Sequence, residues 1–399
     1  MQAKGKPLAA VKREVLAARK RDFTFSSGRI LGSMCTEPHE LARWTHSLFM
    51  ETNLGDPDHF PGCAELESRA LRHIEELVNA PAGSGSLFVS GGTEANILAL
   101  HVARTLTGKR VVVLPEHAHF SFEKAAKLLD MELRYVPLDR ETRVDVQAAR
   151  EAVDERTALV VGVAGTTELG AVDDIEGLAA VAKARGAMLH VDAAFGGFVL
   201  PFMERLGTRV RPWDFRLAGV DSLTIDPHKM GQSTIPGGAF VVRRKEWLDR
   251  IAVKTPYVSA GFQSTILGTR PGGSAAAAYA VMEHLGVAGY TKMVKGMFEV
   301  TRLLRAELEK HGLEAATGGE LPLLVVRCAE PDAVQDELTK AGWRVNVTPR
   351  WGGVRIVLGP HVTKATVRRF VPALAKAVAV TGGPVRGAAP RKLSTPRAR

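Results

Sequence analysis

The stretch Thr224-Ile225-Asp226-Pro227-His228-Lys229-Met230-Gly231 begins as a short apolar strand and ends at a histidine–lysine pair. Upstream, Leu189-His190-Val191-Asp192-Ala193-Ala194 is a similar apolar run that ends in an aspartate. Near-continuous apolar runs are typical of strands that are buried on both faces of a parallel sheet. The two stretches therefore indicate two buried strands, each with a charged residue near its carboxyl end.

The same strand pattern recurs from Leu87 onward and alternates with helical segments. The predicted helices include Glu94–Leu106, Phe122–Leu129 and Ile175–Ala184. The predicted strands are Leu87–Ser90, Val111–Leu114, Leu133–Val136, Leu159–Val163, Met188–Asp192, Ser222–Ile225 and Ala239–Val242. This alternation predicts an α/β fold with a mostly parallel, seven-stranded sheet covered by helices. Active sites in such folds gather at the carboxyl ends of the strands.

The pattern changes after the Ala-rich helix Ala275–Leu285. A second group of elements follows, with helices at 291–311, 333–341 and 364–379 and strands at 323–328, 344–347 and 354–358. We therefore predict four parts. They are an N-terminal segment of helix and loop (1–85, with a helix within 1–20 and a loop-rich region over 21–85), a large domain (86–285), a small α+β C-terminal domain (286–381) and a mobile basic tail (382–399).

Composition excludes several classes of protein. The 399 residues are 45% hydrophobic, which is enough for a large core, and the net charge is +10. No aromatic-interleaved basic run accompanies this charge, so no nucleic-acid partner is expected. The three scattered cysteines predict neither disulfides nor a metal site. No apolar run of ~18 residues and no secretory signal are present, so we expect a cytoplasmic protein without a membrane partner.

A glycine-rich turn, Ser90-Gly91-Gly92-Thr93-Glu94-Ala95-Asn96, follows the first predicted strand and opens a helix. Glycines let the backbone approach an anion closely, and the free N–H groups and dipole of the helix start favour a phosphate. The structural alternative is a tight strand–helix turn with Thr93 as the N-cap. The turn by itself leaves both interpretations open.

Two further strand ends carry polar residues. His119, in Ala118-His119-Phe120-Ser121, could stack on a flat cofactor ring, although a lone histidine is often only structural. Thr166 and Thr167, in Gly165-Thr166-Thr167-Glu168-Leu169-Gly170, would face the same rim in a parallel sheet, and the alternative is a Gly/Thr turn.

Asp192 and Lys229 form the most informative pair. A carboxylate at a strand end with few polar neighbours is costly unless it is paired, although Asp192 could also cap the following segment. Lys229 by itself could be a solvated loop residue. Together, however, a lysine that forms an imine and an aspartate that holds a protonated ring nitrogen are what pyridoxal 5'-phosphate requires from a protein. The sequence therefore predicts this cofactor.

These motifs resemble a known family. Their order and approximate spacing are similar to those of the group II pyridoxal-phosphate decarboxylases of fold-type I, and the matching segments are SGGTEAN, AHFSFEKA, GTTELG, HVDAA and DPHKMG. Further matches make the chain most similar to the archaeal L-tyrosine/L-aspartate decarboxylases, and they lie at 32–35, 51–57, 199–202 and 266–270. The resemblance covers roughly residues 20–380 and leaves out the basic tail.

The resemblance implies a role for each matching residue. Lys229 would form the imine with the cofactor, Asp192 would pair with its pyridine nitrogen, and His119 would stack on its ring. The remaining cofactor contacts would come from Gly91, Gly92, Thr93, Thr167, Ala194 and His228. Thr269 would reach the phosphate from the neighbouring subunit of a homodimer with shared active sites.

The resemblance also implies two residues on the substrate side. Arg355 would hold the α-carboxylate of an amino-acid substrate, and Tyr257, before a loop expected to cover the site, would donate the proton to Cα. The implied reactions are L-tyrosine to tyramine, for methanofuran synthesis, and L-aspartate to β-alanine, for coenzyme A synthesis, in an archaeon.

Alternatives remain at this level. Other fold-type I lyases resembling glutamate decarboxylase, sphingosine-phosphate lyase or cysteine desulfurase fit the same cofactor motifs. A desulfurase would need a mobile-loop cysteine near residues 320–350, whereas Cys328 lies within a predicted strand. A non-enzymatic nucleic-acid binder on the same scaffold is opposed by the presence of Lys229, Asp192 and His119.

Overall fold

The computed structural model describes residues 1–258, 261–316 and 320–385. Seven strands of this described chain form the central sheet: β1 (Gly85–Val89), β2 (Val111–Pro115), β3 (Glu132–Val136), β4 (Thr157–Val163), β5 (Met188–Asp192), β6 (Ser222–Ile225) and β7 (Gly238–Val242). Their spatial order is β1-β7-β6-β5-β4-β2-β3. β7 runs antiparallel to both of its neighbours, and the other pairs are parallel. The prediction of a mostly parallel, seven-stranded sheet is confirmed.

The strands were recognisable because most of them are buried along their whole length. Every residue of β2, β4, β5, β6 and β7 is buried, whereas β3 lies at the edge and is exposed at Glu132. Alternate strand residues enter two different cores. Val112 and Val161 face one core, and Val113 and Val160 face the other. Both faces of the sheet are therefore covered.

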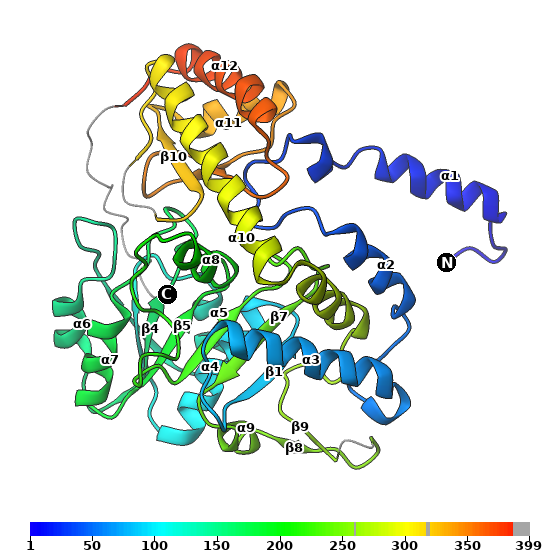
Figure 1. Ribbon diagram of the computed structural model, residues 1–399, viewed down its shortest axis with the longest axis vertical. Coiled ribbons are helices and arrows are strands. Elements are labelled where there is room, and N and C mark those ends of the chain that lie inside the picture. Colours follow the sequence, from blue (N-terminus) through cyan, green and yellow to red (C-terminus); the bar gives the residue numbers. More distant parts are fainter. Residues whose placement is uncertain (259–260, 317–319, 386–399) are drawn as a thin grey trace.

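Helices cover the two faces of this sheet (Figure 1). One core includes side chains from α4 (Gly92–Thr107), α5 (Ser121–Leu129) and α9 (Glu246–Asp249). The other includes side chains from α6 (Val146–Ala152), α7 (Ile175–Ala184) and α8 (Leu200–Arg205), together with α3 and α10, whose bounds are given below. A small hairpin of β8 (Val253–Lys254) and β9 (Phe262–Gln263) and the short helical turns η2 (Pro57–His59) and η3 (Gly196–Phe198) complete this part. A further turn, η1 (Phe25–Ser27), lies beside His361 of the C-terminal elements.

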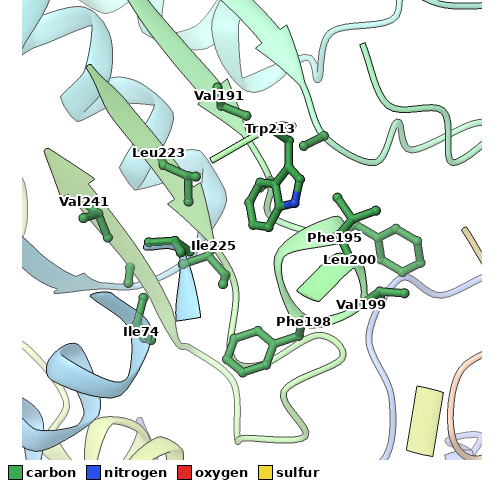
Figure 2. Close-up of a cluster of buried hydrophobic side chains, with 14 of the residues drawn as sticks. Ile74, Val191, Phe195, Phe198, Val199, Leu200, Trp213, Leu223, Ile225 and Val241 are labelled. Carbon is green, nitrogen blue, oxygen red and sulfur yellow. The ribbon is translucent and has the colours of Figure 1, made fainter. Parts of the chain in front are cut away.

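Figure 2 shows part of the second core, where Trp213 lies between strand residues and the segment 195–200. Trp213 is fully buried, and Phe198 and Leu200 are almost completely buried. Burying an aliphatic or phenyl side chain in this way contributes about 1.5–3 kcal/mol. This packing fixes the segment 195–200, which follows β5, and so helps to hold the neighbouring residues Asp192 and Ala194 in place.

The long element α10 (Gly272–Lys310) connects the central sheet to a second layer. Gly286 interrupts it with φ 53° and ψ −170°, which is the break predicted between the helices at 275–285 and 291–311. Figure 1 shows α10 running from the large sheet to the C-terminal elements. These are β10 (Leu323–Arg327), β11 (Asn346–Thr348), β12 (Gly353–Val357), α11 (Pro331–Lys340) and α12 (Lys364–Val380). The domain boundary at this point stays a prediction.

The C-terminal elements have a core of their own. Its three-stranded antiparallel sheet has the order β10-β12-β11. Leu304 and Leu308 of α10, Ile356 of β12 and Phe370 of α12 pack in one cluster with Leu31 from the N-terminal segment. The N-terminal segment is thus attached to the C-terminal layer, and Gly32 lies beside β12.

One expectation for the N-terminal region needs correction. The segment 21–85 was expected to be mainly loop, but it contains α2 (Glu40–Leu48) and the 17-residue helix α3 (Pro61–Leu77), which both pack along α10. The helix within residues 1–20 is present as α1 (Leu8–Arg19), and none of its residues is buried. No helix in the described ranges has the length and apolar character needed to cross a membrane.

The predicted tail lies mostly outside the described residues. Residues 386–399 belong to it and are not described. Its first residues pair with the C-terminal layer, because Pro384 forms a β-bridge with Cys328.

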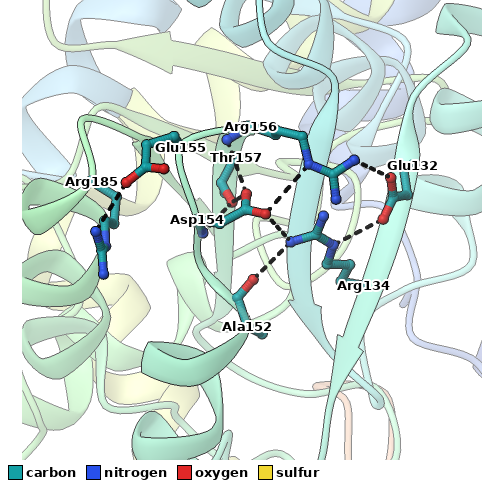
Figure 3. A network of polar contacts seen from close by, with 8 residues as sticks. All are labelled: Glu132, Arg134, Ala152, Asp154, Glu155, Arg156, Thr157 and Arg185. Atoms are coloured by element: carbon teal, nitrogen blue, oxygen red, sulfur yellow. Dashed lines mark hydrogen bonds and ion pairs between the residues drawn. The ribbon is translucent and has the colours of Figure 1, made fainter.

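A polar network holds the amino ends of β3 and β4 together, on the side of the sheet away from the strands' carboxyl ends (Figure 3). Arg134 donates to Asp154 at 2.8 Å, to Glu132 at 2.9 Å and to the carbonyl oxygen of Ala152 at 3.1 Å. The hydrogen bond from Arg134 holds the pKa of Asp154 below its usual range. Arg156 also lies within ion-pair distance of both carboxylates.

Candidate active site

A cavity of about 360 Å³ opens where β1, β2, β4, β5 and β6 end. Its volume falls within the range of small-molecule sites. Nine of the residues predicted from the sequence line it together: Gly91, Gly92, Thr93, His119, Thr167, Asp192, Ala194, His228 and Lys229. They come from five separate stretches of the chain, so the parallel strand ends bring them together as expected.

Lys229 follows β6 and is held by a neighbouring carboxylate. Its Nζ lies 3.0 Å from Oδ2 of Asp226, a residue that is 1% exposed. Burial by itself lowers the pKa of Lys229, but the charges of Asp226 and Asp192 outweigh it and the pKa is raised. The two carboxylates therefore favour the charged ammonium form of Lys229.

Asp192, at the end of β5, presents a carboxylate whose two oxygens each accept one hydrogen bond. Its Oδ2 accepts a hydrogen bond from Nδ2 of Asn96 at 2.9 Å, and its Oδ1 accepts one from the backbone N–H of Ala194 at 3.1 Å. A buried anion that lines a cavity suits a ligand group carrying a proton and positive charge, such as a protonated ring nitrogen.

The glycine turn at the start of α4 lines the cavity and has little space for side chains. Gly91 has φ +149°, and an added Cβ would lie 3.1 Å from Cε1 of His228. A Cβ at Gly92 would lie 3.1 Å from Oδ2 of Asp226 and 3.2 Å from Cβ of Ala194. Side chains at these two positions would fill this part of the cavity. Glycines instead leave the first N–H groups of a 16-residue helix accessible to a ligand. This fits a phosphate group.

The chemistry of the donor set thus fits pyridoxal phosphate. An amine, an anionic carboxylate and an anion-binding helix start lie in one cavity. His119 adds an imidazole whose pKa is lowered by burial, so that its ring is neutral near pH 7.

Three predicted residues lie elsewhere. Tyr257 is 89% exposed and does not line the cavity, and Thr269 is also exposed. Arg355 is buried behind the cavity wall, and it donates to the carbonyl oxygens of Thr167 at 2.9 Å and Gly32 at 2.7 Å. Burial lowers the pKa of Arg355. The fold of one chain therefore does not bring these three residues into the cavity.

Several cavity residues were not singled out from the sequence. Asp226 stands three positions before Lys229, and its carboxylate could have been recognised from that spacing. Asn96 and His117 carried no such signal. His117 lies 3.1 Å through Nε2 from the fully buried Asp173, and its Nδ1 has no hydrogen-bond partner within the described ranges. Only folding brings these polar groups to the cavity.

The cysteine that a desulfurase would need is not accessible. Cys328 is 1% exposed, and burial raises its pKa to about 11. The reactive form of a cysteine is the thiolate, so this residue is poorly suited to nucleophilic attack.

Comparison with protein families and curated proteins agrees with this geometry. Residues 47–326 match the model of the pyridoxal-dependent decarboxylase conserved domain. A protein of Methanothermobacter thermautotrophicus named probable L-tyrosine/L-aspartate decarboxylase is 44% identical over 344 residues, which cover 85% of this chain and 94% of that protein. The L-aspartate/L-glutamate decarboxylase of Pyrococcus horikoshii is 43% identical, with 88% of this chain and 92% of that protein covered. The L-aspartate decarboxylase of Thermococcus kodakarensis is also 43% identical, covering 90% and 94%.

Solved structures show the same fold. A sphingosine-1-phosphate lyase of Burkholderia pseudomallei superposes with a TM-score of 0.86 at 27% identity, covering 95% of this chain and 92% of that one. A glutamate decarboxylase of Lactobacillus brevis superposes with a TM-score of 0.85 at 24% identity, covering 96% and 94%. With its cavity built for pyridoxal phosphate, this chain belongs to the pyridoxal-dependent decarboxylase family and is a pyridoxal-phosphate-dependent amino-acid decarboxylase.

Proposed function

We propose that this enzyme removes the α-carboxylate of L-tyrosine to give tyramine, of L-aspartate to give β-alanine, or of both. The observation that carries the proposal is the meeting of Lys229, Asp192 and the glycine turn in one cavity of a chain over 40% identical to relatives named for these substrates. Glutamate is a second candidate, because one relative of similar identity is named L-aspartate/L-glutamate decarboxylase.

Several residues of the cavity would hold the cofactor. Its phosphate would be bound by Gly91, Gly92, Thr93 and His228, and its ring would be held by Thr167, Ala194 and His119. Asp192 would pair with the ring nitrogen and favour its protonated state. In that state the bound cofactor supplies an electron sink for the bond to the departing carboxylate.

The proton on Nζ of Lys229 is exchanged with the carboxylate of Asp226 in this proposal. Lys229 would hold the cofactor through its amine, and Asp226 would accept the proton that Nζ must lose to do so. Its distance of 3.0 Å from Nζ supports direct transfer. After CO2 leaves, Cα of the product must receive a proton, and we assign this donation to Tyr257 of a second subunit.

Arg355 binds the α-carboxylate in this proposal. Its guanidinium is at hydrogen-bond distance from the carbonyl oxygen of Thr167, a residue that lines the cavity, and its Nε has no partner in the described parts of the chain. A planar, charged fork suits a carboxylate, but the substrate must displace the carbonyl oxygens that Arg355 now contacts.

The proposal also covers the location, the assembly and the pathways of the enzyme. We propose a cytoplasmic, archaeal homodimer in which Thr269 of one subunit contacts the phosphate bound by the other. Tyramine would enter methanofuran synthesis, and β-alanine would enter coenzyme A synthesis.

The test is direct. Purified protein, loaded with pyridoxal phosphate, is incubated separately with L-tyrosine, L-aspartate and L-glutamate, and the amine products and CO2 are quantified. We expect tyramine, β-alanine or both, and no product from a Lys229→Ala variant. Product from glutamate alone, or from none of the three, would refute the proposed substrates.

A further inference from the structure

A buried polar network lies behind the cavity and is centred on Asn96, a residue of α4 that is 1% exposed. Its Nδ2 donates to Oδ2 of Asp192 and to Oγ of Ser121, each at 2.9 Å. Its Oδ1 accepts from Oγ1 of Thr224 at 3.0 Å and lies 3.1 Å from Nε2 of His190. An amide has two donors and two acceptor positions, so the hydrogen-bonding capacity of Asn96 is fully used.

The partners determine the orientation of this amide. Asp192 offers only acceptors when it is ionised, so the NH2 group of Asn96 must face it. Burial lowers the pKa of His190 to about 4, so this ring is neutral and carries one proton. That proton lies on Nε2, toward Asn96, when Nδ1 accepts from the hydroxyl of Ser222 at 2.8 Å. With Nε2 protonated, its possible acceptors are Oδ1 of Asn96 and Oγ1 of Thr224, which lies 3.2 Å away.

The network extends from Asn96 through Ser121 to His119. Because Ser121 Oγ accepts from Asn96, its hydroxyl proton is available to Nδ1 of His119 at 2.9 Å. The backbone N–H of Ser121 also donates to this nitrogen, at 3.2 Å. With two donors directed at it, Nδ1 must carry a lone pair, and the single proton of the neutral ring lies on Nε2.

We propose that Asn96 is a positioning residue that holds the carboxylate of Asp192 and, through Ser121, sets the tautomer of His119. The inference deepens the proposed function and rests on it, because Asp192 is taken to pair with the ring nitrogen of the cofactor and His119 to stack on its ring. α4 begins at Gly92, in the phosphate-binding turn. One helix therefore connects the proposed contacts to the phosphate, the ring nitrogen and the ring face.

Two variants, Asn96→Ala and Ser121→Ala, should remove different hydrogen bonds of this network. Asn96→Ala removes a donor from Asp192 and leaves the hydroxyl of Ser121 free to turn away from His119. Ser121→Ala removes only the hydroxyl that faces His119, and leaves the bond between Asn96 and Asp192 in place. The two variants therefore separate the effect on the ring nitrogen from the effect on the stacked imidazole.

The experiment uses the pyridoxal-phosphate-loaded protein and begins with a spectral titration. We expect Asn96→Ala to shift the pH midpoint of the cofactor's visible absorbance band and to weaken cofactor binding, because the charge on Asp192 is less well held. The corresponding decrease in kcat should be roughly 10- to 100-fold, as for other residues that orient a ligand-contacting group, with little change in KM. Ser121→Ala should leave the spectral midpoint unchanged.

Ser121→Ala has its own signature in the pH profile of kcat. A donor directed at Nδ1 opposes protonation of His119, so its loss should move the acidic limb of the profile to higher pH. In the double variant the decrease in kcat should be smaller than the product of the two single decreases, because both act on His119 through one hydroxyl. A fully multiplicative decrease would contradict this serial arrangement.

The matched control is Thr301→Val. It deletes a buried hydroxyl that donates to the carbonyl oxygen of Met297 in α10, at 2.8 Å, in a region remote from the cavity. It should change neither the spectrum nor kcat. If Asn96→Ala behaves like this control and lowers only the melting temperature, Asn96 is merely structural and the proposal is overturned.

Two further safeguards keep the test decisive. If Asn96→Ala does not fold, Ser121→Ala decides alone, and an unchanged pH profile of kcat overturns the proposal. The spectral titration needs no turnover, so it also separates the two proposals. A wild-type protein that binds the cofactor but decarboxylates none of the three amino acids refutes the proposed substrates, while the Asn96→Ala titration still tests the positioning role.

Discussion

At the scale of single residues, Asp192 accepts hydrogen bonds from Asn96 and from the backbone N–H of Ala194, and in the proposed function its carboxylate also faces a protonated ring nitrogen. Asparagine at this position has nearly the same size, but its amide cannot balance the charge of a protonated ring nitrogen. We expect Asp192→Asn to fold and to lose turnover by orders of magnitude. Circular dichroism and kcat measured on the cofactor-loaded variant check this prediction, and near-normal turnover would refute the role of Asp192.

Arg355 gives a second prediction at this scale. Arg355→Lys keeps the positive charge but loses the planar fork, so we expect cofactor binding close to normal and a similar decrease in kcat/KM for tyrosine and aspartate. The reason is that both substrates present the same α-carboxylate. A suitable control is Arg344→Lys, whose side chain bonds to backbone carbonyl oxygens in the C-terminal layer. Impairment with aspartate alone would instead assign Arg355 to the side-chain carboxylate.

At the scale of elements, the network of Figure 3 joins β3 to β4 on the side of the sheet away from the cavity. Arg134 is 21% exposed at its side chain and its carboxylate partners are more exposed, so solvent screens the contacts. Arg134→Ala should therefore lower the free energy of unfolding by at most about 1 kcal/mol, and less at high salt, without changing kcat. Urea unfolding at two salt concentrations measures this, with Arg19→Ala on the exposed helix α1 as control. A large, salt-independent decrease would contradict it.

At the scale of the whole molecule, buried neutral histidines make stability depend on pH. The pKa of His190 falls from the ordinary 6.5 to about 4 in the folded protein, because of burial, and those of His119 and His361 are lowered for the same reason. The unfolded chain therefore binds more protons between these values. The contribution of His190, on the order of 3 kcal/mol, is fully present above pH 6.5 and is lost as the pH falls toward 4.

Urea unfolding at pH 7 and pH 5 tests this dependence. The decrease in the free energy of unfolding should be smaller in His190→Gln than in the wild type. Replacing an exposed histidine, in His311→Gln, should leave it unchanged. An equal pH dependence in all three proteins would show that His190 does not contribute.

The assembly is the second property of the whole molecule. Because Thr269 and Tyr257 are exposed in one chain and do not line its cavity, we expect a dimer that completes each site with residues of the partner. Light scattering should give a dimer at assay concentrations. Mixed Lys229→Ala and Thr269→Asp proteins should regain activity, since one site of the heterodimer keeps both native residues. An active monomer, or no regain on mixing, would contradict shared sites.

Much of the fold could be predicted because buried parallel strands are apolar along their whole length. The runs at β5 and β6 were identified with their correct bounds, and the break in α10 was visible at Gly286. Helix α3 was missed, because Ile74 is the one large side chain among its fully buried residues and the other two, Cys63 and Ala70, are small and contribute little apolar signal. An added Cβ at Gly272 would lie 2.4 Å from Sγ of Cys63, so this close helix contact depends on small side chains.

The sequence by itself determined the strand ends and the chemistry that they carry: an amine at Lys229, a carboxylate at Asp192 and a glycine turn at the start of a helix. These are local properties, set by residue type and by position relative to an element. Only the tertiary structure decided which residues distant in the sequence support them, as Asn96 does for Asp192. Hydrogen bonds act over about 3 Å in space, and for two residues separated by 96 positions the sequence carries no information about that distance until the chain is folded.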